Sequence, residues 1–246
     1  MQKIEFIMGM PIIIEIIDSS KNSEQAFKKV FKYFRWVDEK FSPYKAKSEV
    51  TLINDARIKI KDISSEMKLI LELCAQTKKE TNNFFDVFYN NAFDPSGLVK
   101  GWAIYEASKI LDKMRLKNYY INAGGDIQTK GLNAKGEKWA VGIKNPFNVK
   151  ENIKIVYLSG EGIATSGIYE KGNHIYNPRG KIKNSIVSVT IIGKNIYEAD
   201  RFATPAFAMG IDGINFIDSL DGLEGYMIDK EGTATMTRGF EKYTND

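Results

Sequence analysis

The chain changes character at residues 119–127, which read Tyr-Tyr-Ile-Asn-Ala-Gly-Gly-Asp-Ile. A run with aromatic and β-branched residues ends there in paired glycines, which is typical of a strand followed by a turn. Similar runs at 139–143, 153–158 and 185–192 alternate with turns rich in Gly and Asn. We therefore predict β structure for this part of the chain.

The segments on either side of this region differ in their periodicity. Apolar residues recur every three or four positions from Ser23, the expected N-cap, to Phe41, which predicts an amphipathic helix. Gly9 and Pro11 divide the first apolar segment, which we interpret as two short strands around a turn. The other segments that we expect to be helical are 65–81, 98–114, 197–209 and 214–220.

The order of these elements predicts the fold class. Helices and strands follow one another without a regular βαβ repeat, and a last strand is expected at 226–228. This order favours an α+β fold over a doubly wound sheet. The chain has no internal repeat and no long linker. We therefore predict one compact, two-lobed domain over residues 1–246, with mixed or antiparallel sheets and flanking helices.

The composition argues against several classes of protein. The 246 residues carry 35 Lys and Arg against 31 Asp and Glu, and this scattered excess of +4 does not predict nucleic-acid binding. The single cysteine, Cys74, excludes a disulfide or a cysteine-based zinc site within one chain, and we expect it in the core. No apolar stretch is long enough to span a membrane. We expect a cytoplasmic protein, the alternative being an export signal removed ahead of residue 1.

Four segments are richer in Gly and polar residues than turns require, and each has an ordinary structural alternative. Residues 94–101 place a Gly-containing turn and Lys100 at a helix start, where backbone N–H groups suit a phosphate. The alternative is a capped turn with a solvated lysine. The paired glycines of 122–127 allow close approach of a backbone to another group, and a hairpin turn is the alternative.

The third segment contains the only histidine of the chain. Thr165 and Ser166 lie shortly before His174. Their hydroxyl groups could bind a phosphate, and the imidazole could act as a general base near neutral pH. The alternative is a surface loop with an incidental histidine.

The fourth segment places Asp200 four residues before Thr204. On a continuous helix both side chains share one face, and both are hard oxygen donors of the kind that Mg²⁺ binds. One alternative is a simple hydrogen bond along the helix surface. Another is a new helix that begins at Pro205 with Thr204 as its N-cap, which would separate the two side chains.

These segments, in this order, resemble the ApbE-type FAD:protein FMN transferases from Met8 to about Gly210. Met10, Tyr105 and Asn177 stand where the family has Thr, Asp and Asp. The matching motifs are Met8-Gly9, Phe41-Ser42-Pro43-Tyr44, Ser48-Glu49 with Asn54, Phe85-Asp86, Asp94 to Gly101, Gly124-Gly125-Asp126-Ile127, Ala164-Thr165-Ser166-Gly167, His174-Ile175-Tyr176-Asn177-Pro178, Ala199 to Thr204 and Met209-Gly210.

The resemblance implies a set of site residues. His174 would be essential to catalysis, and Mg²⁺ would be held by the Gly97 backbone carbonyl, Asp200 and Thr204. The residues that would line the FAD site are Met8, Tyr44, Phe85, Asp86, Asp94, Lys100, Thr165, Ser166 and Ile175.

The resemblance also implies an activity. FMN would move from FAD to a Ser or Thr hydroxyl of a target flavoprotein, with release of AMP. The departures from the family motifs leave two alternatives open. One is an Mg²⁺-dependent FAD diphosphatase that forms FMN and AMP, and the other is an FAD-binding protein without turnover.

Overall fold

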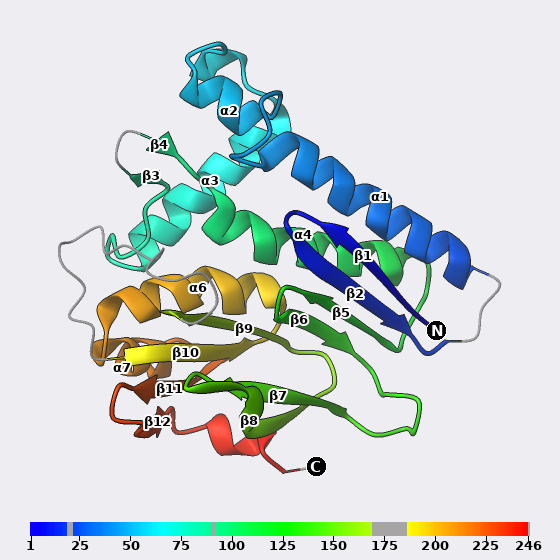
Figure 1. The fold of residues 1–246 in the computed structure, drawn as a ribbon, viewed down its shortest axis with the longest axis vertical. Helices are drawn as coiled ribbons and strands as arrows, with labels where there is room; N and C mark the ends of the chain where they lie inside the picture. The colour runs from blue at the N-terminus through cyan, green and yellow to red at the C-terminus, as the bar shows by residue number, and fades with distance from the viewer. Residues whose placement is uncertain (19–21, 90–91, 169–185, 246) are drawn as a thin grey trace.

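The computed structural model describes residues 1–18, 22–89, 92–168 and 186–245 (Figure 1). His174 and Ile175, both expected at the site, lie outside the described residues, as does Asn177, a departure from the family motif. Within the described residues, no helix has both the length and the apolar composition that crossing a membrane requires.

The fold is built on an eight-stranded sheet whose strand order is β1-β2-β5-β6-β9-β10-β11-β12, with every neighbouring pair antiparallel. Two separate antiparallel pairs, β3-β4 and β7-β8, complete the β structure. The strands are β1 (Gln2–Ile7), β2 (Met10–Ile16), β3 (Phe88–Tyr89), β4 (Ala92–Phe93), β5 (Tyr119–Ala123), β6 (Asp126–Lys130), β7 (Trp139–Asn145), β8 (Asn148–Leu158), β9 (Gly162–Gly167), β10 (Ile186–Gly193), β11 (Leu223–Asp229) and β12 (Ala234–Met236).

The described helices lie mainly to one side of this sheet (Figure 1). In that view α2, α3 and the β3-β4 pair gather at one end of the molecule, beyond α4 and α6. The helices are α1 (Ser23–Phe41), α2 (Glu49–Asn54), α3 (Ser65–Glu80), α4 (Ser96–Lys113), α6 (Ile196–Met209) and α7 (Asp212–Asp218), with 3₁₀ turns η1 (Ile60–Asp62) and η2 (Phe240–Tyr243).

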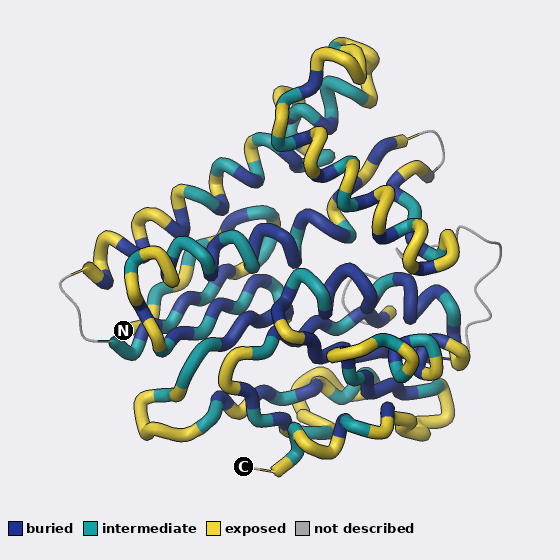
Figure 2. Tube along the Cα trace, turned by 180° about the vertical axis from the view of Figure 1, so that it is seen from behind, coloured by how far each residue is buried: buried dark blue, intermediate teal, exposed yellow. Residues whose placement is uncertain are grey.

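The sheet separates two hydrophobic cores. The larger core joins its helix side to α1, α4 and α6, and includes Phe27, Phe34 and Ile14. The smaller core lies beneath the β7-β8 hairpin and η2, and includes Val156 and Phe240. Figure 2 shows that burial is deepest in the sheet and in the helices that cover it, while the far end around α2 is exposed. Successive side chains along a strand pack alternately into the two cores, as expected for a sheet covered on both faces.

The α+β prediction is confirmed, and the expected helices and strands are present with small shifts of most ends. The exception is β8, which begins at Asn148 and not at the expected residue 153. Ser23 is wrong as an N-cap, because Asn22 takes that position and the Ser23 hydroxyl donates to the Asp18 carbonyl at 3.1 Å. The sequence patterns did not predict α2, β3, β4 or β12, nor the strands β6 and β9, whose polar and glycine residues resemble those of turns. The strands β6 and β9 lie in the interior of the eight-stranded sheet, each with a neighbouring strand on both sides.

Candidate functional site

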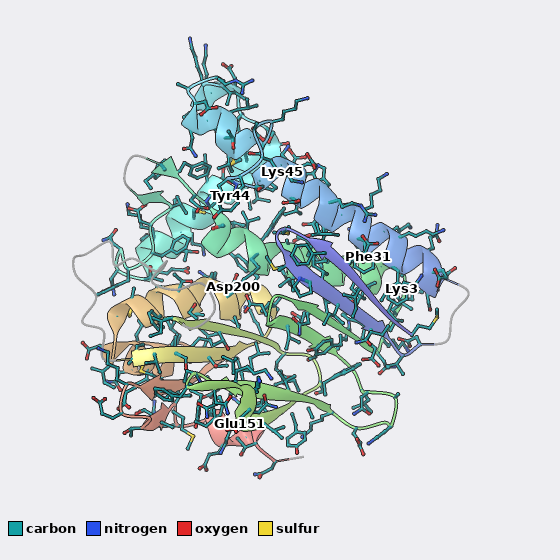
Figure 3. All side chains as sticks on the ribbon, in the orientation of Figure 1. Lys3, Phe31, Tyr44, Lys45, Glu151 and Asp200 are labelled. Carbon is teal, nitrogen blue, oxygen red and sulfur yellow. The ribbon has the colours of Figure 1, made fainter. Side chains whose placement is uncertain are left out.

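Helices α4 and α6 approach each other closely at Gly101 and Asp200. The Gly101 N–H donates to Asp200 Oδ2 at 2.7 Å. A Cβ atom at position 101 would lie 2.5 Å from Asp200 Cβ, so only glycine fits there without displacing α6. Figure 3 shows Asp200 on α6, on the side that faces α4. Glycine is therefore needed at position 101, next to Lys100, because α4 and α6 are in contact there.

Lys100 lies next to this contact and faces two carboxylates. Its Nζ is 2.5 Å from Asp126 Oδ2 and 3.9 Å from Asp200 Oδ1. The carboxylates are almost completely buried, whereas the lysine side chain keeps 23% of its exposure. The remaining oxygen of Asp126, Oδ1, accepts from the backbone N–H of Thr165 at 3.3 Å. One ammonium group thus compensates two buried carboxylates only in part.

Asp126 reaches this position because β5 and β6 are joined by a two-residue turn. Gly124 and Gly125 have φ angles of +59° and +98°, a conformation that glycine adopts without steric cost. The hairpin alternative for these glycines is therefore correct. It also serves the site, because the turn directs the first residue of β6 toward α4 and α6.

Burial dominates the electrostatics of Asp200. Burial raises the pKa of its carboxyl group above the ordinary value, the Lys100 ammonium lowers it, and the Asp126 charge raises it again. Because burial dominates, the ionised carboxylate is destabilised in the metal-free protein. A divalent cation would stabilise the charged form and relieve this cost.

The expected Mg²⁺ donors fit such a cation in their chemistry. Helix α6 is continuous through Pro205, so Thr204 stays one turn from Asp200, and the alternative in which Thr204 is an N-cap is wrong. Thr204 Oγ1 is 3.3 Å from Ser166 Oγ. The third donor, the Gly97 carbonyl, lies in the first turn of α4, and its usual helical donor is the same Gly101 N–H that binds Asp200. Carboxylate, hydroxyl and carbonyl oxygens are the ligands that Mg²⁺ prefers.

The described part of the chain holds no cluster of three or more His, Cys, Asp and Glu side chains placed to bind a metal ion. A cation at Asp200 would therefore depend on the neutral oxygens of Thr204 and Gly97. Mg²⁺ commonly completes its shell with waters and substrate phosphates, which is compatible with so few protein ligands.

Two further expected residues, Phe85 and Asp94, lie at the start of α4. Phe85 is buried, and its Cε2 would lie 3.5 Å from a Cβ at Gly97. Exposed Asp94 accepts from the Ser96 N–H at 2.9 Å, just ahead of Pro95, the N-cap of α4. The alternative of a solvated lysine for 94–101 is wrong, because Lys100 pairs with buried Asp126. Gly97 and Lys100 lie one helical turn apart on α4.

Three other expected residues make different contacts. Tyr44 is 93% exposed and follows α1 (Figure 3). Asp86 Oδ2 accepts from Lys78 Nζ at 2.6 Å. Met8 occupies the β1-β2 turn with a φ of +57° and packs against the larger core.

Thr165 and Ser166 point to opposite faces of the sheet. Ser166 contacts Thr204 on α6, on the helix side. Thr165 Oγ1 is 2.9 Å from Thr190 Oγ1 on the neighbouring strand, with which it is paired in register. Only Ser166 presents its hydroxyl to the cluster, whereas Thr165 contributes a backbone N–H to Asp126.

The site residue that sequence reasoning missed is Asp126. It stands within a motif quoted above, but its side chain had no assigned role. The available signal was its place directly after two glycines at a strand end. The sequence could not show that Lys100, 26 positions earlier, is its partner.

A surface hollow of about 320 Å³ lies beside the start of α6 and contains none of the expected site residues. Arg201 lines it and is paired with Glu80 and Glu198, the latter at 2.7 Å. These pairs join α3 to α6 and neutralise the buried guanidinium. The ion pairs of Arg201 therefore give this hollow an ordinary structural explanation.

Comparisons with known proteins agree with this fold. The ApbE family model matches residues 8–94 and 90–227. The chain belongs to the ApbE family. An ApbE protein of Thermotoga maritima has a solved structure that matches all of this chain and 99% of its own, with a TM-score of 0.89 at 21% identity. The flavin transferase ApbE of Vibrio cholerae matches 99% of each chain, with a TM-score of 0.85 at 20% identity.

Sequence relatives of this ApbE-family chain are named FAD:protein FMN transferase. The protein of Salmonella typhimurium is 30% identical over 155 residues, which are 58% of this chain and 44% of the relative. That of Vibrio cholerae is 34% identical over 128 residues, which are 48% of this chain and 38% of the relative. The chain thus matches less than half the length of these curated relatives.

Proposed function

We propose that this ApbE-family protein is an Mg²⁺-dependent FAD:protein FMN transferase. The observation that carries the proposal is the cluster of buried Asp200 and Ser166 with half-buried Thr204 and Lys100 at the α4–α6 contact, in a chain that matches the family model over most of its length. The cluster combines hard oxygen donors with a cationic side chain. That combination suits a diphosphate bound together with a divalent cation.

The donor would be FAD and the acceptor a Ser or Thr hydroxyl of a target flavoprotein. The acceptor oxygen would bond to the phosphorus on the FMN side of the diphosphate, and the bond from that phosphorus to the AMP oxygen would break. His174 would take the hydroxyl proton, and AMP would leave as the second product. Bound Mg²⁺ would neutralise charge that develops on the phosphoryl oxygens.

The residues of the chain have distinct tasks in this proposal. Asp200, Thr204 and the Gly97 carbonyl would hold the cation, and Lys100 would face the diphosphate. Phe85 and Met8 would offer apolar surface to the flavin, joined by exposed Tyr44. Ile175, Asp86, Asp94, Thr165 and Ser166 would complete the FAD site. We keep a cytoplasmic location as a prediction from the sequence.

Incubation of the protein with FAD and Mg²⁺, with and without a candidate acceptor domain, tests this function. Transfer gives AMP together with flavin fluorescence on the acceptor after a denaturing gel. AMP release without any acceptor would instead identify an FAD diphosphatase. If FAD stays bound and no AMP forms with or without the acceptor domain, the protein is a flavin carrier.

A further inference from the structure

The carboxylates of Asp126 and Asp200 make the same two kinds of contact. Each carboxylate gives one oxygen to a backbone N–H, from Thr165 for Asp126 and from Gly101 for Asp200. Each directs its other oxygen toward Lys100 Nζ. The ammonium is much closer to Asp126, at 2.5 Å against 3.9 Å, and Asp126 is only 2% exposed.

This asymmetry decides which carboxylate the lysine neutralises. Electrostatic attraction grows as the distance between charges falls, and it is strong where water is excluded. Asp126 therefore holds the ammonium, and Asp200 Oδ1 is left farther from it. With the Asp126 charge removed, Asp200 would become the nearest buried anion to Lys100, one turn of α6 from the hydroxyl of Thr204.

We infer that Asp126 is a positioning residue that holds the Lys100 ammonium away from Asp200, so that Asp200 stays available to a divalent cation while Lys100 stays beside it to face an anionic substrate. The inference rests on the proposed function for the identity of the cation and the substrate. Its structural content is that a lysine and a cation would otherwise compete for one carboxylate.

A double-mutant cycle on cation binding tests this competition without FAD. Mn²⁺ serves as the probe, and its free concentration is followed by its paramagnetic resonance signal. Asp126→Asn should weaken Mn²⁺ binding by about tenfold, because the released ammonium turns to Asp200. Lys100→Met alone should change the affinity less than about threefold, because the lysine is already held away.

The decisive measurement is the effect of Lys100→Met in the Asp126→Asn background. There it should restore Mn²⁺ affinity by about tenfold, because the competitor is gone. A simple sum of charges predicts the same effect of Lys100→Met in both backgrounds, and that result would overturn the inference. A double variant as weak as Asp126→Asn would show that Asp126 is itself a ligand, which would also overturn it.

The test has a fallback and a control. If Asp126→Asn does not fold, Lys100→Met alone still decides, since a tenfold gain in Mn²⁺ affinity would show that the lysine already competes in the wild type. The matched control is Glu24→Gln with Lys3→Met, an exposed pair at 2.6 Å that should leave Mn²⁺ affinity unchanged.

The inference and the proposed function can fail separately. Wild-type protein that transfers FMN but shows an additive cycle would reject the positioning role and keep the function. A coupled cycle in a protein that neither releases AMP nor labels an acceptor would reject the function and keep the positioning role.

Discussion

The N–H of Gly101 donates to Asp200 Oδ2 at 2.7 Å, while a Cβ at position 101 would lie 2.5 Å from the Cβ of Asp200. The two residues are 99 positions apart in the chain. Their contact sets the spacing of α4 and α6, and with it the distance from Lys100 and the Gly97 carbonyl to the carboxylate. The geometry of the proposed cation site thus depends on one glycine.

Gly101→Ala should therefore destabilise the protein. The added methyl group would force α4 and α6 apart, at a cost of about 1–3 kcal/mol for overpacking. The better helix propensity of alanine would offset at most about 1 kcal/mol of this. Urea unfolding measures the change in the free energy of unfolding. The control is Gly160→Ala, where nothing lies within 4 Å of the added Cβ, and equal stability of the two variants would contradict the close contact.

Asp200→Asn should raise the Mg²⁺ concentration needed for turnover while the fold is kept. Asparagine has nearly the same shape, but it lacks the only charge among the proposed cation ligands, and Mg²⁺ prefers charged oxygens. Turnover against Mg²⁺ concentration gives the requirement, and circular dichroism monitors the fold. Asp218→Asn is the control, because it removes a carboxylate that forms an ion pair outside the cluster, with Arg238 at 2.8 Å. An unchanged Mg²⁺ requirement in Asp200→Asn would place the cation elsewhere.

The protein should bind FAD more tightly than FMN or riboflavin. Lys100 and the cation ligands are expected to act on the diphosphate, which FMN lacks. A charge-assisted hydrogen bond contributes about 1.5–3 kcal/mol, so the preference should reach about tenfold or more. Calorimetry with the three ligands in the presence of Mg²⁺ measures it. Equal affinities would argue against a diphosphate site at α4.

His174→Ala should lose about 10²–10⁴-fold in transfer and still bind FAD, because a positioned base contributes about that factor. No other histidine in the chain can replace it. If the residue-177 side chain hydrogen-bonds the ring, Asn177→Asp should raise the pKa of the histidine by adding a negative charge, so the activity profile should move to higher pH. Rates of acceptor labelling between pH 5.5 and 9 check both variants. Full transfer by His174→Ala would contradict the role of a histidine base and would indicate that the metal alone activates the acceptor hydroxyl.

Cys74 should be inert in the native protein. Burial, together with the nearby charge of Asp86, raises the pKa of its thiol to about 12. At pH 8 an exposed thiol is partly ionised, with a pKa near ~8.5, whereas Cys74 is almost entirely protonated. Its thiolate fraction should still be rising above pH 9, where that of an exposed thiol levels off. Labelling with a disulfide reagent at pH 8 should detect one thiol only after unfolding in guanidinium, and rapid labelling of native protein would contradict the buried position.

Local patterns in the sequence determined most of the elements and the motifs. The helix over Ser23–Phe41 covers the predicted range apart from its N-cap, because the apolar spacing of a helix is visible within one segment. The paired glycines predicted the β5-β6 turn by the same local logic. The strands β6 and β9 were missed because their polar and glycine residues hide the alternation, and only neighbouring strands in the sheet explain their burial.

The tertiary structure alone decided how the site is assembled. The sequence places Lys100, Asp126 and Asp200 in three separate motifs, and nothing local shows that one ammonium lies between two carboxylates. It also placed Thr165 and Ser166 together, whereas the pleat of β9 sends their hydroxyl groups to opposite faces. Distances across a fold follow from sheet register and helix packing, which depend on residues far apart in the chain. The sequence therefore determined which groups are available for chemistry, and the packing of β6, α4 and α6 determined which of them meet.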